Sequence, residues 1–226
     1  MAVSVAELLQ NNPARLWRAR AQGADSAAPQ GLPTGYAALD SCLPGQGWPR
    51  QGLIELLSDQ RGIGELRLLM PALARLCGRP QGARTKAAKT RATAAGGARG
   101  GWIACVSPPY VPYAPALAEC GIDVSRVLVV HGAGATEWAM DQALRSEACS
   151  AVLGWANPRD PQALRRLQLA AEQSHSLAVL FRPLQAGLTS SPAVLRLALF
   201  GDAQQGLQVR IVKSRGGRPA TVSLGH

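Results

Sequence analysis

The segment Ser-Asp-Gln-Arg-Gly-Ile-Gly-Glu (58–65) has the glycine spacing of a phosphate-binding loop. In such a loop, backbone N–H groups surround the phosphates, a lysine contacts the β- and γ-phosphates, and a Ser or Thr hydroxyl binds magnesium. Here Glu65 stands at the lysine position and Leu66 at the hydroxyl position. A carboxylate facing a triphosphate is unfavourable, whereas at the start of a helix it complements the helix dipole. We therefore predict a tight strand-to-helix turn that binds no cofactor.

This vestigial loop keeps one side chain that can bind some other anion, Arg61. Its residues are Ser58, Asp59, Gln60, Arg61, Gly62, Ile63, Gly64 and Glu65. The chain has five dispersed cysteines without a CxxC pair and only three histidines. That inventory argues against a disulfide framework, a zinc site or a histidine-based nucleophilic centre. No metal site is expected.

The elements that must position this loop alternate along the chain. Apolar strand candidates at 52–57, 101–107, 126–132, 150–156 and 177–183 are separated by helix candidates at 65–76, 113–121, 136–149 and 161–174. Continuous apolar strands between amphipathic helices predict a parallel sheet covered on both faces. Two more strands, 195–201 and 206–215, are expected to form an antiparallel pair at the edge. The predicted fold class is therefore α/β.

One part of the chain looks separate from this main domain of residues 31–226. Residues 1–30 read as an N-terminal helix and linker, in which Leu8, Leu9, Leu16 and Trp17 share one side. This helix either packs on its own core or contacts a partner subunit.

No apolar run is long enough to span a membrane. The basic residues follow the apolar part of the N-terminus, the reverse of a secretory signal, which predicts a cytoplasmic protein.

The formal net charge of +10 raises the question of nucleic-acid binding. Much of the excess lies in a Gly/Ala/Thr-rich insert at 79–101, which reads as a flexible loop or as a phosphate contact. A second basic group stands near the C-terminus beside two glycines. Its members, Arg210, Lys213, Arg215 and Arg218, are our candidates for DNA contact; the alternative is a solvated edge strand that its charge protects from aggregation.

Aromatic residues give two further candidate surfaces. Trp138 lies in a polar helix segment and is a candidate partner-binding residue, because exposed tryptophan is enriched at interfaces. Tyr110 and Tyr113 lie in a proline-rich run, where they either stack on a partner or belong to a loop that the prolines stiffen. Trp155, at the end of a predicted strand, would fill space that a magnesium ion needs.

From Leu32 onwards the chain resembles the RecA recombinase core. The matching positions before the loop are Thr34, Gly35, Leu39, Asp40, Leu43, Gly45, Gly47, Pro49, Gly52 and Glu55. The chemistry of RecA does not carry over. Its loop lysine and threonine correspond to Glu65 and Leu66, its water-activating glutamate falls near Ser107, and its strand-end aspartate falls near Trp155. The resemblance therefore implies a RecA-like domain that is not an enzyme.

Ordered strings such as "GIGELRLL", "PPYVPYAPAL" and "WAMDQALRS" resemble the ImuA family, often described as SulA-like. This chain departs from that family in its basic insert and in having Gln46 where the family prefers glycine. The resemblance implies an accessory factor of error-prone translesion DNA synthesis in the SOS response to DNA damage. The implied partners are ImuB and a second-copy replicative-type error-prone polymerase, with RecA, DNA and further copies of the chain as additional candidates.

Two other functions stay open at this stage. The first is a cell-division inhibitor of the SulA type, which is also RecA-like and lacks a working loop. The second is a divergent RecA-like ATPase or nucleotide switch with a non-standard loop. The N-terminal helix and the C-terminal "SRGGRP" favour ImuA over the SulA type.

Overall fold

The structure is a computed structural model that describes residues 31–77, 101–132, 134–202 and 206–225. The predicted N-terminal helix, with Leu8, Leu9, Leu16 and Trp17, lies outside the described residues, and so does the basic insert up to residue 100.

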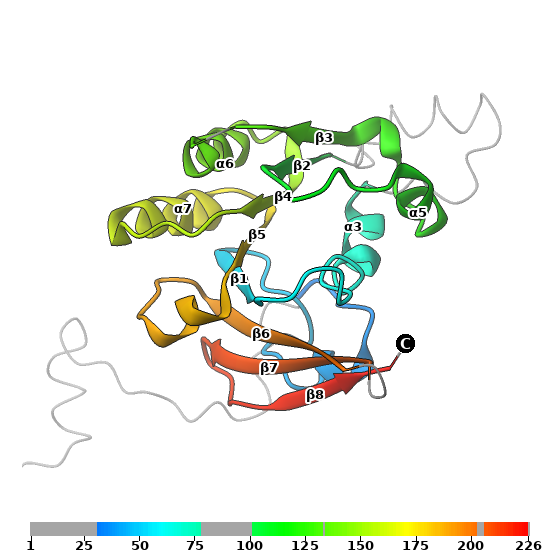
Figure 1. Cartoon of the computed structure of the whole chain (residues 1–226), viewed down its shortest axis with the longest axis vertical. Helices are drawn as coiled ribbons and strands as arrows, with labels where there is room; N and C mark the ends of the chain where they lie inside the picture. Colours follow the sequence, from blue (N-terminus) through cyan, green and yellow to red (C-terminus); the bar gives the residue numbers. More distant parts are fainter. Residues whose placement is uncertain (1–30, 78–100, 133, 203–205, 226) are drawn as a thin grey trace, which may run out of the picture.

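A single eight-stranded sheet organises the described chain (Figure 1). Its strands are β1 (Leu53–Leu57), β2 (Trp102–Val106), β3 (Val127–Val130), β4 (Cys149–Trp155), β5 (Leu177–Arg182), β6 (Leu195–Asp202), β7 (Gly206–Ser214) and β8 (Thr221–Leu224). The spatial order is β3-β2-β4-β5-β1-β6-β7-β8. Strands β1 to β6 pair in parallel, and β7 and β8 pair antiparallel. The predicted α/β class is confirmed.

The C-terminal strands differ from the prediction in one respect. β6 is an interior strand that pairs in parallel with β1, and β8 forms the edge beyond β7. The prediction missed β8 because its four residues, Thr-Val-Ser-Leu, follow a Gly-Gly-Arg-Pro turn and carry a weak apolar signal. β7 is therefore not an edge strand along its first half.

Helices cover both faces of the parallel part of the sheet (Figure 1). The helices are α2 (Ala37–Asp40), α3 (Met70–Cys77), α5 (Ala114–Glu119), α6 (Thr136–Arg145) and α7 (Pro161–Gln173), with 3-10 turns η1 (Val124–Arg126) and η2 (Leu184–Leu188). α6 and α7 pack on one face, and α3 and α5 lie on the other. At the start of α7, the Asp160 carboxylate accepts a hydrogen bond from the Gln162 N–H and Pro161 follows, a favourable helix start.

The two faces bury two apolar cores. The larger core joins β1, β2 and β4 to α3 and includes Trp48, which is fully buried. The second joins the opposite faces of the same strands to α6 and α7 through Met140 and Leu167. β1 and β5 are buried along their whole length, as expected for parallel strands covered on both sides.

Gln46 gives a stability prediction, because its φ is 56° in the turn before β1. Left-handed backbone is unfavourable for a residue with a Cβ, whereas glycine adopts it freely. We expect Gln46→Gly to raise the free energy of unfolding by about 0.5–1 kcal/mol, since part of the relieved strain is offset by the larger entropy of glycine in the unfolded chain. Urea unfolding checks this. Equal or lower stability would show that the turn holds Gln46 without strain.

The cysteines give a second prediction. Cys77, Cys105 and Cys149 are buried, and Cys120 is exposed. Burial raises the pKa of the Cys105 thiol to about 12 and also raises the pKa values of Cys77 and Cys149. Because the folded pKa values lie above the unfolded ones, these thiols favour folding below about pH 9 and lose that contribution as pH rises towards 12. We expect stability to fall over this range and Cys120 to react first with a thiol reagent. Uniform labelling of all five cysteines would contradict the prediction.

Candidate functional site

The glycine loop lies between β1 and α3, at the carboxyl end of the parallel strands where α/β proteins bind ligands. Glu65 is not at the start of a helix, so that prediction was wrong: residues 61–69 form turns, and α3 begins at Met70. The reason is Pro71. A proline in a helix interior loses a hydrogen bond and clashes with the preceding turn, but it is tolerated in the first turn. The helix therefore begins five residues later than expected.

Glu65 instead turns back into its own loop. Its Oε1 accepts a hydrogen bond from the backbone N–H of Gly62 at 3.0 Å. In a phosphate-binding loop such N–H groups contact phosphate. Here a carboxylate of the chain takes the place of that anion at Gly62. Gly62 (φ 71°) and Gly64 (φ 101°) have left-handed backbone, which only glycine adopts without strain.

Three other polar side chains of the loop, those of Ser58, Asp59 and Gln60, are also bonded inside the protein, whereas Arg61 is exposed and lines a pocket. Ser58 bonds to the backbone of Gln60. Asp59 Oδ1 accepts the N–H of Leu184 at 2.8 Å, and Gln60 Oε1 accepts the N–H of Gly201 at 2.9 Å. These bonds fix the loop to η2 and to β6. The loop is thus held in place by its own side chains.

A pocket of about 370 Å³ opens beside this loop. It is lined by Ser58, Arg61, Glu65, Ser107, Trp155 and Phe181, among others. The Trp155 and Phe181 rings stack with centroids 4.5 Å apart and planes 3° apart. Trp155 ends β4, where the resemblance to RecA places an aspartate. An aromatic pair, rather than a carboxylate, therefore stands at this position of the pocket lining.

A buried cluster of charged side chains lies on the other face of β1, and the sequence did not predict it. Glu55 is fully buried between two arginines. Its Oε1 accepts from Arg182 Nη1 at 3.1 Å and from Ser191 Oγ at 2.6 Å, and its Oε2 accepts from Arg196 Nε at 2.7 Å. Both arginines are over nine-tenths buried. We refer to Glu55, Arg182 and Arg196 as the buried triad.

The register of the sheet assembles this triad. Arg196 of β6 lies directly opposite Glu55 of β1, and Arg182 ends the neighbouring β5. Arg196 also donates to the carbonyl oxygens of Thr189 (2.8 Å) and Ala186 (2.6 Å), which holds η2 against the sheet. The signal in the sequence was a charged residue in each of three apolar strands.

Lys213 lies at the margin of the same cluster. Its Nζ donates to the carbonyl oxygen of Ser191 at 2.7 Å. Partial burial and the neighbouring charges of Arg196 and Arg215 lower the pKa of this lysine. Its ammonium group is thus directed towards the buried triad.

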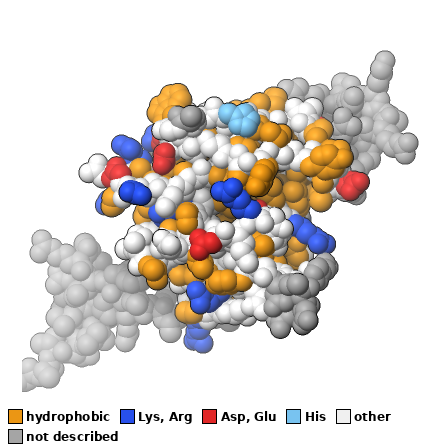
Figure 2. Space-filling model, viewed as in Figure 1, with side chains coloured by type: hydrophobic (Ala, Val, Ile, Leu, Met, Phe, Trp, Pro, Cys, Tyr) orange, Lys and Arg blue, Asp and Glu red, His pale blue; other side chains and the backbone are white. Residues whose placement is uncertain are grey.

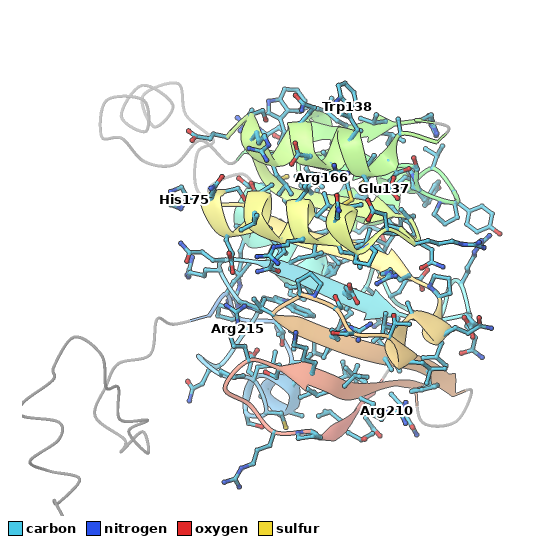
Figure 3. All side chains as sticks on the ribbon, turned by 90° about the vertical axis from the view of Figure 1, so that its left-hand side faces the viewer. Glu137, Trp138, Arg166, His175, Arg210 and Arg215 are labelled. Atoms are coloured by element: carbon cyan, nitrogen blue, oxygen red, sulfur yellow. The ribbon has the colours of Figure 1, made fainter. Side chains whose placement is uncertain are left out.

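The structure spreads out the four basic candidates for DNA contact. Arg210 lies over the Phe200 ring at 5.4 Å, while Arg215 contacts Glu172 at 3.5 Å and lines a different pocket. Figure 3 shows Arg210 and Arg215 well apart along β7. Arg218 is exposed in the turn before β8. Basic side chains are likewise scattered in the view of Figure 2. DNA contact by these residues stays a prediction.

A bulge in β7 affects the faces of these side chains. Lys213 pairs with Arg196 and Ile211 pairs with Leu197, so Val212 is an extra residue. Arg210 and Lys213 therefore point to the same face of the sheet, although an unbroken strand would place them on opposite faces.

The three aromatic candidates for partner contact are among the exposed apolar side chains. Trp138 on α6 is 67% exposed. Tyr110 and Tyr113 are also mostly exposed, on the proline-rich segment after β2. Both tyrosines are therefore exposed, although the prolines of this segment restrict its backbone. Contact of these three residues with a partner stays a prediction.

The described residues set two limits on the chemistry. They contain no group of three or more His, Cys, Asp or Glu side chains that could hold a metal ion. Within the same described ranges, no helix has the length and apolar character needed to cross a membrane.

Comparisons with known proteins add a partial similarity. No family model matches the chain. A curated protein from Edwardsiella piscicida, named cell division inhibitor SulA, is 34% identical over 92 residues, which are 40% of this chain. The match spans about half, 55%, of that protein. The crystal structure of SulA from Pseudomonas aeruginosa aligns with a TM-score of 0.40 and 21% identity, over 57% of this chain and 97% of that one. The chain is thus similar in sequence to a SulA protein over part of its length.

Proposed function

We propose that this protein is a non-enzymatic accessory factor of error-prone translesion DNA synthesis in the SOS response. In this proposal it binds ImuB and a second-copy replicative-type error-prone polymerase. The observation that carries the non-enzymatic part is the Glu65 carboxylate bonded to Gly62 inside the glycine loop. The partners rest on the ordered strings that resemble the ImuA family, and the partial similarity to SulA supports only the association with the SOS response.

The geometry supports a binding role over a catalytic one. The side chains of Glu65, Asp59 and Gln60 are occupied by internal bonds to Gly62, Leu184 and Gly201. The stacked rings of Trp155 and Phe181 line the adjoining pocket. In contrast, Tyr110, Tyr113 and Trp138 are exposed, which suits partner anchors.

The test is affinity purification of the tagged full chain from DNA-damaged cells, followed by mass spectrometry. We expect recovery of ImuB and the polymerase. Trp138→Ala and the double variant Tyr110→Ala/Tyr113→Ala are expected to reduce that recovery. Leu169→Ala is a matched control, because Leu169 on α7 is also exposed (46%) but lies away from both aromatic sites in sequence. Normal folding with no recovery of either protein would refute the proposed partners.

A SulA-type cell-division inhibitor is the second candidate function, and the 34% identity to a curated protein of that name favours it. Its test is expression of the chain in undamaged cells while cell length is measured. Filamentation together with co-purification of the division-ring protein would establish this function in place of the first. Cells of normal length would exclude it.

A divergent ATPase or nucleotide switch makes a different prediction. A nucleotide that binds only the folded state raises the melting temperature by mass action. Because Glu65 occupies the loop, we expect no shift with millimolar ATP or GTP and no hydrolysis. A clear shift that Glu65→Gln enhanced would show that the loop still binds nucleotide.

A further inference from the structure

β3 is the first strand of the sheet order and pairs on one side only, with β2 (Figure 1). Its other edge therefore presents backbone N–H and C=O groups without a ladder partner in the described part of the chain. Proteins usually protect such an edge with a very short strand, charged residues, proline or a bulge. β3 is short, with the four residues Val-Leu-Val-Val, but it has no charged residue, proline or bulge. The opposite edge, β8, alternates exposed Thr221 and Ser223 with buried apolar residues.

The side chains of β3 add an apolar surface to this edge. Leu128 is 44% exposed and Val130 is 38% exposed. They pair with Ala104 and Val106 of β2, which pack with Met140 of α6. Leu128 and Val130 therefore lie on the α6 face of the sheet. Trp138 of α6 lies at the same end of the molecule, since Figures 1 and 3 share their vertical axis. Hydrophobic side chains are prominent at this end in Figure 2.

We propose that β3 pairs with β3 of a second copy of this chain, antiparallel and across a two-fold axis. The orientation of the backbone restricts the possible registers. The Val130 carbonyl accepts the N–H of Ser107, so the backbone groups of Val130 face β2. Because neighbouring residues of a strand alternate, those of Val127 and Val129 face outwards.

More than one register pairs these outward-facing groups and keeps equivalent faces together, and one of them also brings the exposed apolar residues of the two copies together. In that register Val129 sits on the two-fold axis and exchanges both backbone hydrogen bonds with its own copy. Val127 exchanges both with His131 of the second copy. Leu128 then lies directly opposite Val130 of that copy, in the non-hydrogen-bonded positions where side chains approach most closely. The exposed apolar residues of each copy cover those of the other.

The distribution of charge around β3 is compatible with a second copy of this chain at the edge. β3 contains no charged residue, and the antiparallel arrangement moves the Arg126 side chains of the two copies to opposite ends of the ribbon. An isologous contact needs a self-complementary strand, which an uncharged and alternately exposed β3 provides. The net charge of +10 on each chain opposes association at long range, so added salt should strengthen the dimer.

Sedimentation equilibrium of the full chain over a concentration series tests the proposal. We expect the mass to rise with concentration from 23.7 kDa towards twice that value, at lower protein concentrations when salt is added. Leu128→Lys and Val130→Lys should each leave a monomer with unchanged circular dichroism. Ser223→Lys, at the other sheet edge, should still dimerise. A wild-type chain that stays monomeric, a dimer that Leu128→Lys leaves intact, or a dimer that salt dissociates would each overturn the proposal.

Cross-linking tests the register separately. In a Cys120→Ser background, Val129→Cys should form a disulfide-linked dimer under mild oxidation, because opposite residues of a hydrogen-bonded pair are about 5.5 Å apart between Cα atoms, within disulfide range. Thr221→Cys in the same background is the control and should remain monomeric. Equal cross-linking of the two variants would contradict pairing at β3.

Discussion

Glu55→Gln is expected to lower the free energy of unfolding by about 3–5 kcal/mol. The substitution keeps the volume of the side chain but removes the negative charge between Arg182 and Arg196, both of which are almost fully buried. Two buried guanidinium groups are then left without a counter-charge. Since a whole domain is stable by about 5–15 kcal/mol, this is a large fraction of the total. Urea denaturation, followed by circular dichroism, measures it.

The matched control is Glu172→Gln. Glu172 also pairs with an arginine, Arg215, but at 3.5 Å and with both side chains more than a third exposed. Surface pairs contribute about 0–1 kcal/mol, so this variant should stay within about 1 kcal/mol of the wild type. Similar losses in the free energy of unfolding for Glu55→Gln and Glu172→Gln would show that burial does not determine how much the triad contributes to stability.

The triad also bears on the function of the fold. The middle of β1, the end of β5 and the start of β6 meet at Glu55. Arg196 also donates to the carbonyl oxygens of Ala186 in η2 and of Thr189, which follows it. The segment after β5 is thereby fixed by charge-assisted hydrogen bonds. A binding scaffold benefits from such rigidity because less conformational entropy is lost on association.

The parallel strands could be predicted because each is a continuous apolar run, as burial on both faces requires. The start of α3 could not be placed from apolar spacing alone, since Glu65 to Leu69 fit a helix and only Pro71 limits where it begins. β8 was missed because half of its side chains are polar and exposed. The local apolar pattern thus identified the buried strands. It did not predict the start of α3, which Pro71 limits, or the edge strand β8, which is half exposed.

The candidate site could be predicted only in part. The loss of the phosphate-binding side chains was visible in the sequence at Glu65 and Leu66. The hydrogen bond from Gly62 to Glu65 was not, because it depends on the path of the turn. Glu55, Arg182 and Arg196 are separated by up to 141 positions, so their contact follows from strand order, which the sequence alone does not establish. An acidic and two basic residues inside apolar strands were nevertheless a usable signal, since buried charges are generally paired.

Trp155→Ala is the other substitution with a large expected effect, a loss of about 3 kcal/mol in the free energy of unfolding. It removes a half-buried ring that packs on the larger core and stacks on Phe181. The stacking adds about 0.5–1.5 kcal/mol to the loss of apolar contact. Trp155→Phe keeps a ring in the stack and should cost less than about 1.5 kcal/mol. Thermal and urea unfolding of the two variants provide the measurement.

Trp138→Ala separates stability from binding, because Trp138 is mostly exposed and its loss should change stability by less than about 0.5 kcal/mol. If Trp155 serves the fold and Trp138 serves a partner, Trp155→Ala lowers stability and Trp138→Ala lowers only partner recovery. A Trp155→Ala variant as stable as the wild type would mean that the ring is not needed for the stability of the fold. A ligand that contacts the Trp155 face of the adjoining pocket would then have to be sought.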